Sequence, residues 1–466
     1  MNLSQAIRVT NPTCLAIVGA GGKTTALFQL ARELSLREGA VIVTTTTHLH
    51  VDQIKLADSH RVAAKPEDLE DFAKDLHGVI LVTGPKEGDR TTGVNPDVIS
   101  RLRAIQDLHH LPLLIEADGS RRKPLKAPAA YEPVIPEFVD MVLVFAGLAG
   151  LRKPLTNEFV HRPEIYAALS GQNLGEIITP GSIVRVLTHP SGGMKNIPVR
   201  ARRVALLNQA DTPELQAQAK MIAEQLMPGF HAVISASLNP PPSLPGERSK
   251  IHAVFEPVAG IILAGGGSTR FGRPKQLLDW QGKPFVRVVA ETALNAGLSP
   301  VVVVTGAHAD QVEEALIDLK VIVAHNPEWQ TGQSSSIRAG LLAFPQPTSQ
   351  EASSKDHEVI SGWDGVGAAI FLLTDQPQIT PTILRALGEE HARTLAPIVA
   401  PLVRGERANP VLFDRITFPE LMMLSGDVGG RAIFSKVPVN YLTWHDESLL
   451  SDVDTAGEYR KLVNGE

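Results

Sequence analysis

The chain has 466 residues, which is more than one ordinary hydrophobic core holds, and at roughly 150 residues per domain we expect two domains. Its 44 Lys and Arg against 50 Asp and Glu give a formal charge of -6, so the composition gives no reason to expect a nucleic-acid partner. The single cysteine, Cys14, excludes a disulfide scaffold, and no apolar run reaches the roughly 20 residues that span a bilayer, so we expect a cytoplasmic protein without a membrane partner.

Apolar runs that are typical of strands alternate with helix-like segments along the whole chain. Such alternation predicts parallel sheets that are covered by helices. We therefore expect an α/β fold with two Rossmann-like three-layer α/β domains and mainly parallel sheets. The expected strands are 15–18, 41–44, 79–82, 113–116 and 141–145 in the first half, and 260–263, 300–304, 321–324, 368–373 and 398–400 in the second.

The first expected strand runs directly into a glycine-rich loop, Val18-Gly-Ala-Gly-Gly-Lys-Thr-Thr25, which opens a helix expected over 26–36. This order is the context that a phosphate-binding loop requires. Ile17 stands where the common G-x-x-x-x-G-K-[ST] pattern has its first glycine, so the loop has the shorter G-x-x-G-K-T form. A glycine turn with a purely structural role is the alternative. The candidate phosphate-binding residues are Gly19, Gly21, Gly22, Lys23 for the β- and γ-phosphate oxygens, and Thr24 for Mg²⁺.

Acidic residues end the next candidate segment, where the apolar run 113–115 leads to Asp118, as expected of a Walker B carboxylate. Further on, Asn208-Gln-Ala-Asp211 resembles the guanine-reading Asn-Lys-x-Asp of GTPases, with a glutamine in place of the lysine. Because Asp211 suits a helix cap equally well, we leave this motif out of the predicted site. Lys126 and the run 44–48 either complete a second anionic pocket or, in the case of His48, mark a polar strand end.

Several motifs accompany the glycine loop in this half: Thr44-Thr-Thr-Thr-His48, Glu116-Ala-Asp-Gly119, Pro124-Leu-Lys-Ala-Pro128, Glu132-Pro-Val-Ile-Pro136 and His189-Pro-Ser-Gly192. With these motifs, the first half resembles the YqeC-type family, which is associated with selenium-dependent molybdenum hydroxylases. The resemblance implies a P-loop-type nucleotide-binding domain over 1–238, with ATP or GTP as the candidate ligand. The chemistry of that family is poorly defined, so we assign no reaction to this domain.

Clustered prolines follow at Asn239-Pro-Pro-Pro-Ser-Leu-Pro-Gly246, and they disfavour helix and predict a semi-rigid extended segment. We therefore expect a proline-rich linker over 239–257 and a second domain over 258–466. Within that domain, the polar stretch 345–365 is expected to be a surface loop.

The second domain opens on an apolar strand that runs into Ile261-Ile-Leu-Ala-Gly-Gly-Gly-Ser-Thr-Arg-Phe-Gly-Arg-Pro-Lys275. Glycines allow the backbone to approach phosphate oxygens closely, and their N–H groups can bind an anion. Arg270 and Lys275 are expected to neutralise the remaining phosphate charge. The loop therefore predicts a nucleoside triphosphate site, with Leu263, Ala264, Gly265, Gly266, Gly267 and Ser268 as candidate contacts.

Two aspartates are candidate ligands of Mg²⁺, because hard carboxylate oxygens suit this ion where it bridges phosphates. Asp375 follows an apolar strand, and ligands of open α/β sheets gather at the carboxyl ends of such strands. Asp454 supplies a second carboxylate from the far end of the sequence. As alternatives, Asp375 only shapes a turn and Asp454 is a helix N-cap.

Further motifs follow in order: Thr305-Gly-Ala-His308, Gly332-Gln-Ser-Ser-Ser-Ile-Arg-Ala-Gly340, Leu373-Thr-Asp-Gln-Pro377, Asn409-Pro410, Gly426-Asp-Val-Gly-Gly430 and Asp452-Val-Asp-Thr455. Together with the glycine loop, they make this half resemble the MobA-like nucleotidyltransferases that attach CMP or GMP to molybdopterin. The resemblance implies Arg270, Lys275 and Asp375 as catalytic residues and the molybdenum cofactor as acceptor. It also implies nucleotide contacts at Ser334 and Ser335, which otherwise suit the start of a helix.

The choice between CTP and GTP depends on a mixed signature. Ala264-Gly265-Gly266 resembles the guanylyl branch of the family, whereas Ser268, Arg273-Pro274-Lys275 and Asp375-Gln376-Pro377 resemble the cytidylyl branch. We therefore predict a molybdenum cofactor cytidylyltransferase that acts on CTP, releases pyrophosphate and serves a molybdenum hydroxylase. The alternatives are a guanylyltransferase, a sugar-phosphate nucleotidyltransferase, and a nucleotide-regulated carrier or chaperone of the cofactor.

Overall fold

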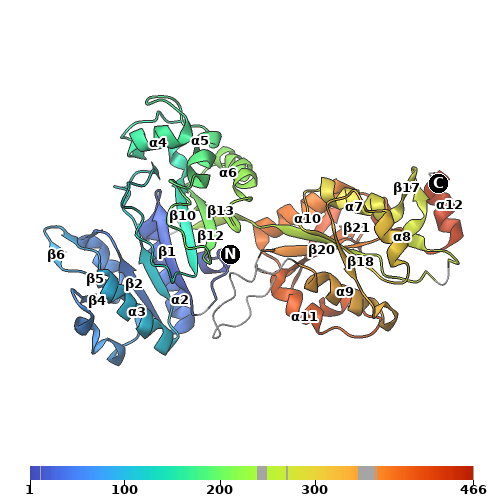
Figure 1. The fold of residues 1–466 in the computed structure, drawn as a ribbon, viewed down its shortest axis with the longest axis horizontal. Coiled ribbons are helices and arrows are strands. Elements are labelled where there is room, and N and C mark those ends of the chain that lie inside the picture. The colour runs from blue at the N-terminus through green and yellow to red at the C-terminus, as the bar shows by residue number, and fades with distance from the viewer. Residues whose placement is uncertain (11, 239–248, 269–270, 345–362, 364, 465–466) are drawn as a thin grey trace. The chain divides into compact units, whose positions relative to one another are not determined.

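The computed structural model describes the chain except residues 11, 239–248, 269–270, 345–362, 364 and 465–466. The described chain forms two compact units, Met1–Phe255 and Glu256–Glu466, each a mainly parallel sheet with helices on both faces (Figure 1). This confirms the predicted α/β fold class. No helix among the described residues is both long enough and apolar enough to cross a membrane.

The first unit is built on a nine-stranded sheet. Its strands are β1 (Cys14–Gly19), β2 (Ala40–Thr45), β4 (Ser59–Val62), β5 (Gly78–Thr83), β8 (Leu113–Glu116), β10 (Met141–Gly147), β12 (Arg202–Asn208), β13 (Ala232–Ser237) and β14 (Lys250–Phe255). Their order is β14-β13-β12-β10-β1-β8-β2-β5-β4, and all neighbours are parallel except β13 and β14. Shorter strands are β3 (Leu49–His50), β6 (Lys86–Glu87), β7 (Arg90–Thr91), β9 (Leu125–Lys126) and β11 (Val160–His161).

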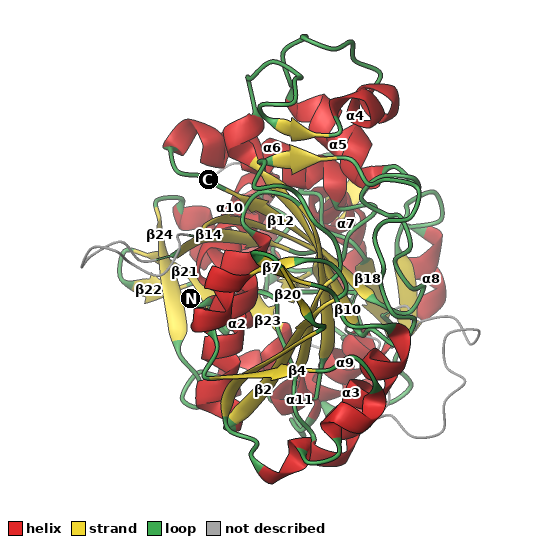
Figure 2. Cartoon of the chain, turned by 90° about the vertical axis from the view of Figure 1, so that its left-hand side faces the viewer, coloured by secondary structure: helices red, strands yellow, loops and turns green. Residues whose placement is uncertain are grey.

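The inner strands of this sheet are buried along nearly their whole length, as in β2, where all six residues are buried. A strand that is buried on both faces needs a continuous apolar run, and helices must cover both faces. Figure 2 shows α2 and α3 on opposite sides of the sheet, and α3 packs into the same buried cluster as α5 and α6. The helices are α1 (Leu3–Ala6), α2 (Lys23–Glu38), α3 (Pro96–His109), α4 (Pro163–Ser170), α5 (Pro180–Thr188) and α6 (Pro213–Leu226).

The second unit contains an eight-stranded sheet. Its strands are β15 (Val258–Leu263), β18 (Val301–Thr305), β19 (Ile322–His325), β20 (Ala368–Leu373), β21 (Ile398–Val403), β22 (Glu406–Arg407), β23 (Val411–Asp414) and β24 (Val439–Trp444), beside the hairpin β16 (Asp279–Trp280) and β17 (Lys283–Pro284). Their order is β19-β18-β15-β20-β23-β21-β22, and β24 pairs with β21. Strands β15, β18, β19 and β20 are mutually parallel, whereas β23 runs antiparallel to both of its neighbours.

Successive residues of β15 point to opposite faces, so Ile261 and Ile262 lie in two separate buried clusters. Helices α7 (Phe285–Asn295) and α10 (Pro381–Thr394) cover one face, and α9 (Gln333–Leu342) and α11 (Phe418–Met422) cover the other (Figure 1). Each fully buried aliphatic side chain contributes about 1.5–3 kcal/mol to the stability of this packing. The remaining helices are α8 (Ala309–Glu314) and α12 (Ala456–Asn464).

The expected linker 239–257 is described only from residue 249 onward. There, β14 pairs with β13 and completes the sheet of the first unit, and β15 begins at Val258. The expected surface loop 345–365 lies almost wholly outside the described residues. Helix α2 begins at Lys23, three residues before its predicted start at 26, because the glycine loop already ends at Gly22, the N-cap.

Candidate active site

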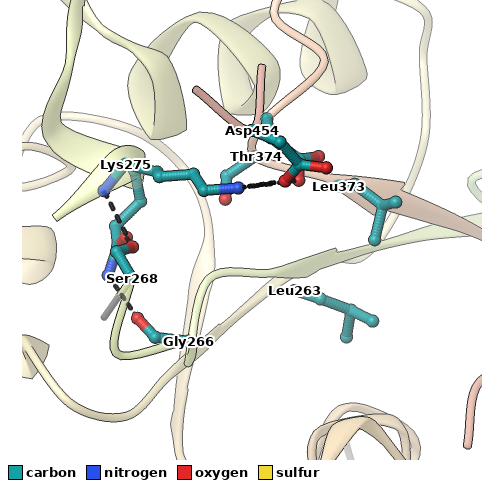
Figure 3. Close-up of a pocket in the computed structure, with 9 residues that line it drawn as sticks. Leu263, Gly266, Ser268, Lys275, Leu373, Thr374 and Asp454 are labelled. Carbon is teal, nitrogen blue, oxygen red and sulfur yellow. Dashed lines mark hydrogen bonds and ion pairs between the residues drawn. The ribbon is translucent and has the colours of Figure 1, made fainter. Parts of the chain in front are cut away.

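One pocket of the second unit lies where β15 and β20 end. These strands are adjacent and parallel, with Leu263 beside Leu373, so the loops that follow them emerge at the same edge of the sheet. Between the loops is a pocket of about 350 Å³ (Figure 3). Its lining residues are Leu263, Gly266, Ser268, Lys275, Gln276, Leu373, Thr374, Asp375 and Asp454.

The glycine loop leaves little room for side chains at two of its three glycines. A Cβ on Gly267 would lie 3.0 Å from the Trp329 ring, and one on Gly265 would lie 3.2 Å from the Ser336 hydroxyl. At Gly266 nothing lies within 4 Å of such a Cβ, and this residue lines the pocket. The backbone of the loop therefore packs closely on its neighbours and leaves Gly266 open to a ligand.

A buried glutamine that the sequence did not single out fixes this loop. Gln276 is 2% exposed, and its Nε2 donates to the Gly266 carbonyl at 3.1 Å. The Ser268 hydroxyl donates to Gln276 Oε1 at 3.2 Å and accepts from the N–H of Lys275 at 2.9 Å. The loop and the residue that carries the lysine are thus held as one piece. The only signal in the sequence is an amide side chain between Lys275 and two leucines.

Lys275 brings the two predicted metal ligands together. Its Nζ donates to Asp454 Oδ1, as Figure 3 shows, and lies 3.9 Å from Asp375 Oδ2. Burial raises the pKa of Asp375 to about 6, and the Asp452 carboxylate adds to the rise while Lys275 opposes it. The structure therefore gathers one cation and two carboxylates from three distant parts of the chain.

The donor set of this pocket fits a divalent cation that is shared with phosphate. Asp375 Oδ1 is buried and has no hydrogen-bond partner in the described part of the chain, so it is free to accept a cation. No three His, Cys, Asp or Glu side chains of the described residues are arranged to hold a metal ion. Mg²⁺ commonly uses only one or two carboxylates and takes its other ligands from phosphates and water. Asp375 and Asp454 would hold it in that way.

The structure does not bring every predicted residue to this pocket. Arg270 lies outside the described residues. Ser334 is buried and its hydroxyl donates to the Gly426 carbonyl at 2.7 Å. Ser335 is also buried and donates to the Gly332 and Glu328 carbonyls. Both hydroxyls hold loops around the start of α9, and neither lines the pocket of Lys275.

In the first unit, the glycine loop follows β1, near the middle of the sheet. Gly19, Gly21 and Gly22 have φ of 96°, 93° and 112°, which residues with side chains rarely adopt. A Cβ on Gly21 would lie 2.5 Å from the backbone of Gly147. Asn208, from the motif that we left out of the prediction, donates to the Gly21 carbonyl at 2.7 Å. The loop is therefore fixed to the ends of two neighbouring strands.

The predicted residues Lys23, Thr24 and Asp118 meet at this loop. Lys23 Nζ donates to the Gly19 carbonyl at 2.8 Å and lies 3.1 Å from Asp118 Oδ1. Thr24 donates to Glu116 Oε2 at 3.0 Å. Glu116, the last residue of β8, was not among the predicted site residues. Burial raises the pKa of its carboxyl, and the charge of Lys23 opposes this rise.

Lys126, for which two roles were open, extends this cluster. Its Nζ donates to Asp118 Oδ2 at 2.8 Å and to Glu132 Oε2 at 2.9 Å, and Glu132 in turn accepts from both ends of the Arg162 guanidinium. Burial opposes ionisation of Glu132, but the hydrogen bonds from Arg162 and the charge of Lys126 lower its pKa to about 2. Cations and carboxylates thus alternate from the glycine loop to the start of α4.

Each unit carries a glycine-rich loop beside carboxylates at the carboxyl edge of its sheet, as nucleotide-binding α/β proteins do. The second unit is a nucleotidyltransferase. Residues 15–164 match the family described as YqeC protein, and residues 260–441 match the family described as MobA-like NTP transferase domain. The chain belongs to both families as a fusion of the two domains, which confirms both predicted resemblances.

Three relatives illustrate the two halves. The YqeC protein of Escherichia coli (strain K12) is 33% identical over 209 residues, which cover 42% of this chain and 76% of that protein. Nicotine blue oxidoreductase of Paenarthrobacter nicotinovorans is 31% identical over 218 residues, covering 44% of this chain and 96% of that protein. A probable molybdenum cofactor guanylyltransferase of Bacillus cereus (strain Q1) is 44% identical over 64 residues, covering 14% of this chain and 32% of that protein.

Proposed function

We propose that the second unit transfers CMP from CTP to the molybdenum cofactor, releases pyrophosphate, and thereby serves the maturation of a molybdenum hydroxylase. The observation that carries this proposal is Lys275, held between Asp375 and Asp454 at the end of a glycine loop. In the reaction, a phosphate oxygen of the cofactor attacks the α-phosphorus of CTP and the bond to pyrophosphate breaks.

The residues of the pocket have separate tasks in this reaction. The loop at Gly266 holds the phosphates through backbone N–H groups, and Lys275 neutralises charge that develops on the departing pyrophosphate. Asp375 and Asp454 would hold Mg²⁺, which when bound supplies further neutralisation of the phosphates. Arg270 keeps its predicted role on the phosphates.

The acceptor is supported by the MobA-like family and by the relative named as a probable molybdenum cofactor guanylyltransferase. That name favours GTP, whereas Ser268, Arg273-Pro274-Lys275 and Asp375-Gln376-Pro377 favour CTP. Another relative of this unit carries the name of an oxidoreductase. A glycine loop with a lysine and two carboxylates suits phosphate chemistry, so we retain the transferase.

We propose for the first unit a site for Mg²⁺ with ATP or GTP, formed by Gly19, Gly21, Gly22, Lys23, Thr24 and Asp118. Its support is the close packing of the glycine loop against Gly147 and the position of Lys23 beside Asp118. All of these residues lie in the first unit, and we propose no reaction for this site.

The deciding experiment measures pyrophosphate release by the full chain with CTP, GTP or ATP and purified molybdenum cofactor. CTP is expected to give the fastest release, and a preference for GTP would reverse the choice of nucleotide. Turnover of a sugar 1-phosphate without the cofactor would favour the sugar-phosphate alternative. The absence of turnover with all three nucleotides would reject the transferase, and unimpaired cofactor delivery by Asp375→Ala would favour a carrier.

A further inference from the structure

The segment that carries Asp452 and Asp454 has no helix or strand of its own. It follows the 3₁₀ helix Glu447–Leu450 and precedes α12. The Asp454 side chain is 62% exposed, yet it reaches Lys275 in the pocket. Backbone that lacks a regular ladder is held in place by the hydrogen bonds that other segments offer it.

The N–H of Asp454 donates to Glu458 Oε2 at 2.8 Å, and further hydrogen bonds come from the loop that follows β20. Gln378 Nε2 donates to the Ser451 carbonyl at 2.6 Å and to the Ser448 carbonyl at 3.0 Å. The backbone adds one more contact, in which the N–H of Val453 donates to the Asp375 carbonyl at 3.1 Å. The loop that carries one predicted metal ligand is therefore joined to the segment that carries the other.

Gln376 makes another contact with this segment. It is 1% exposed, and its Nε2 donates to Asp452 Oδ1 at 2.6 Å. An amide that donates to an ionised carboxylate forms a stronger bond than one that donates to a neutral acceptor. Asp375, Asp452 and Asp454 carry the same charge and repel one another. The bond from Gln376 holds Asp452 in place despite this repulsion.

We propose that Gln376 and Gln378 are positioning residues that set Asp454 at the correct distance from Asp375 and Lys275 for a shared divalent cation. The proposal rests on the proposed function, because it gives Asp375 and Asp454 the role of metal ligands. Neither glutamine lines the pocket, and both contact the segment 448–454. Residues that orient metal ligands in this way typically change metal affinity about 10–100-fold when they are replaced.

The test measures Mn²⁺ binding to the full chain in the presence of CTP, by electron paramagnetic resonance of the free ion. Sites that are lost in Asp375→Asn are assigned to this pocket, which separates them from sites in the first unit. Gln376→Met and Gln378→Met remove the amide donors at nearly constant size. Each is expected to weaken Mn²⁺ binding at the assigned site about tenfold.

Gln172→Met is the matched control. Gln172 lies in the first unit, donates to the Ile177 carbonyl at 2.8 Å, and has a buried Oε1 without a partner among the described residues, as Gln376 and Gln378 do. It is expected to leave Mn²⁺ binding at the assigned site unchanged. Wild-type affinity in both Gln376→Met and Gln378→Met would overturn the proposal.

A double variant that exchanges the amide and the carboxylate distinguishes lost positioning from a folding defect. Gln376→Glu is expected to weaken Mn²⁺ binding because two carboxylates then face each other. Adding Asp452→Asn restores one amide donor and one carboxylate acceptor, and is expected to bring binding back to within about threefold of wild type. Failure of this rescue would also overturn the proposal.

The two proposals fail in different ways. If the wild-type protein binds Mn²⁺ through Asp375 but releases no pyrophosphate with any acceptor, the proposed function is rejected, and weaker Mn²⁺ binding by the glutamine variants would still support their positioning of a metal site. If the wild-type protein turns over and the glutamine variants bind Mn²⁺ normally, the positioning role is rejected and the transferase stands.

Discussion

The N–H group of Gly19 donates to both carboxylate oxygens of Asp118, at 3.1 and 3.0 Å, although the two residues are 99 positions apart in the chain. The carboxylate thus lies at the first backbone donor of the glycine loop. A phosphate bound in this loop, as we propose, would compete with Asp118 for Gly19 and for Lys23, which also contacts this carboxylate. We therefore expect the nucleotide affinity of the first unit to depend on how these contacts are exchanged.

Lys23→Met removes the cation of this loop and is expected to weaken binding of ATP and GTP to the first unit about 10–100-fold, the usual loss for a charged hydrogen-bond partner. Binding is measured by calorimetric titration of the full chain. Lys153→Met, which removes a lysine that stacks on Phe159, is the control and should bind normally. Pyrophosphate release by the second unit should be unaffected, and its loss would contradict the assignment of Lys23 to a separate site.

Lys275→Met is expected to lower the rate of pyrophosphate release about 10²–10³-fold, because one preorganised charge on the phosphates is lost. Lys283→Met is the control, since Lys283 pairs with Glu291 and does not line the pocket. Stopped assays at saturating CTP separate this effect on turnover from an effect on binding. A wild-type rate of pyrophosphate release by Lys275→Met would contradict the role of Lys275 on which the proposed function rests.

Asp375→Asn tests the raised pKa of this carboxyl. An acid whose pKa is higher in the folded state, here about 6 against 3.8, stabilises the fold below pH 4 and loses that contribution as the pH rises through 6. The free energy of unfolding of the metal-free wild type should therefore fall by at most about 3 kcal/mol across this window. Urea titrations at pH 4 and pH 7 should show a smaller fall for Asp375→Asn, and equal falls would reject the raised pKa.

Glu132→Gln probes the cluster that extends from the glycine loop. Replacing this carboxylate removes the partner that Lys126 and Arg162 share, although Lys126 keeps its ion pair with Asp118, and the change is expected to cost about 3 kcal/mol of stability at pH 7. Because the pKa of Glu132 is lowered to about 2, the wild type should lose this contribution as the pH falls from 4.5 toward 2. Thermal melts at pH 7 check the prediction, and an unchanged melting temperature would contradict it.

Gly21→Ala and Gly39→Ala separate backbone strain from steric collision. Both glycines have positive φ, 93° and 83°, so both variants carry the strain of about 1–2 kcal/mol. Only at Gly21 would the new Cβ meet backbone atoms, whereas nothing lies within 4 Å at Gly39. Gly21→Ala should therefore be the less stable variant in denaturant titrations and should also lose nucleotide binding. Equal stabilities would show that the loop can shift.

Much of this architecture follows from local sequence. Continuous apolar runs predicted the inner strands, and the glycine loop of the second unit predicted where the pocket of Lys275 lies. The sequence did not predict β12, β13 or β14, because short runs with polar ends become strands only through the partners they find in the sheet. The strand β14 lies within the segment 239–257, which its clustered prolines led us to predict as a linker.

Side-chain contacts across long stretches of chain were the hardest to predict. Asn208 contacts the glycine loop of the first unit, and Gln276, Gln376 and Gln378 hold segments around the pocket of the second unit. An amide side chain in a sequence gives no sign of its distant acceptor. Ser334 and Ser335 were expected to contact the nucleotide, but their hydroxyls donate to backbone carbonyls within the fold.

The antiparallel strand β14 has a practical consequence for dividing the protein. It covers the edge of β13, and only two residues separate its last residue, Phe255, from β15, which begins at Val258. A fragment that stops at 238 would expose the N–H and C=O groups of β13, and uncovered edge strands promote self-association. The shortest fragment of the first unit that does not expose the edge of β13 should therefore end at Phe255.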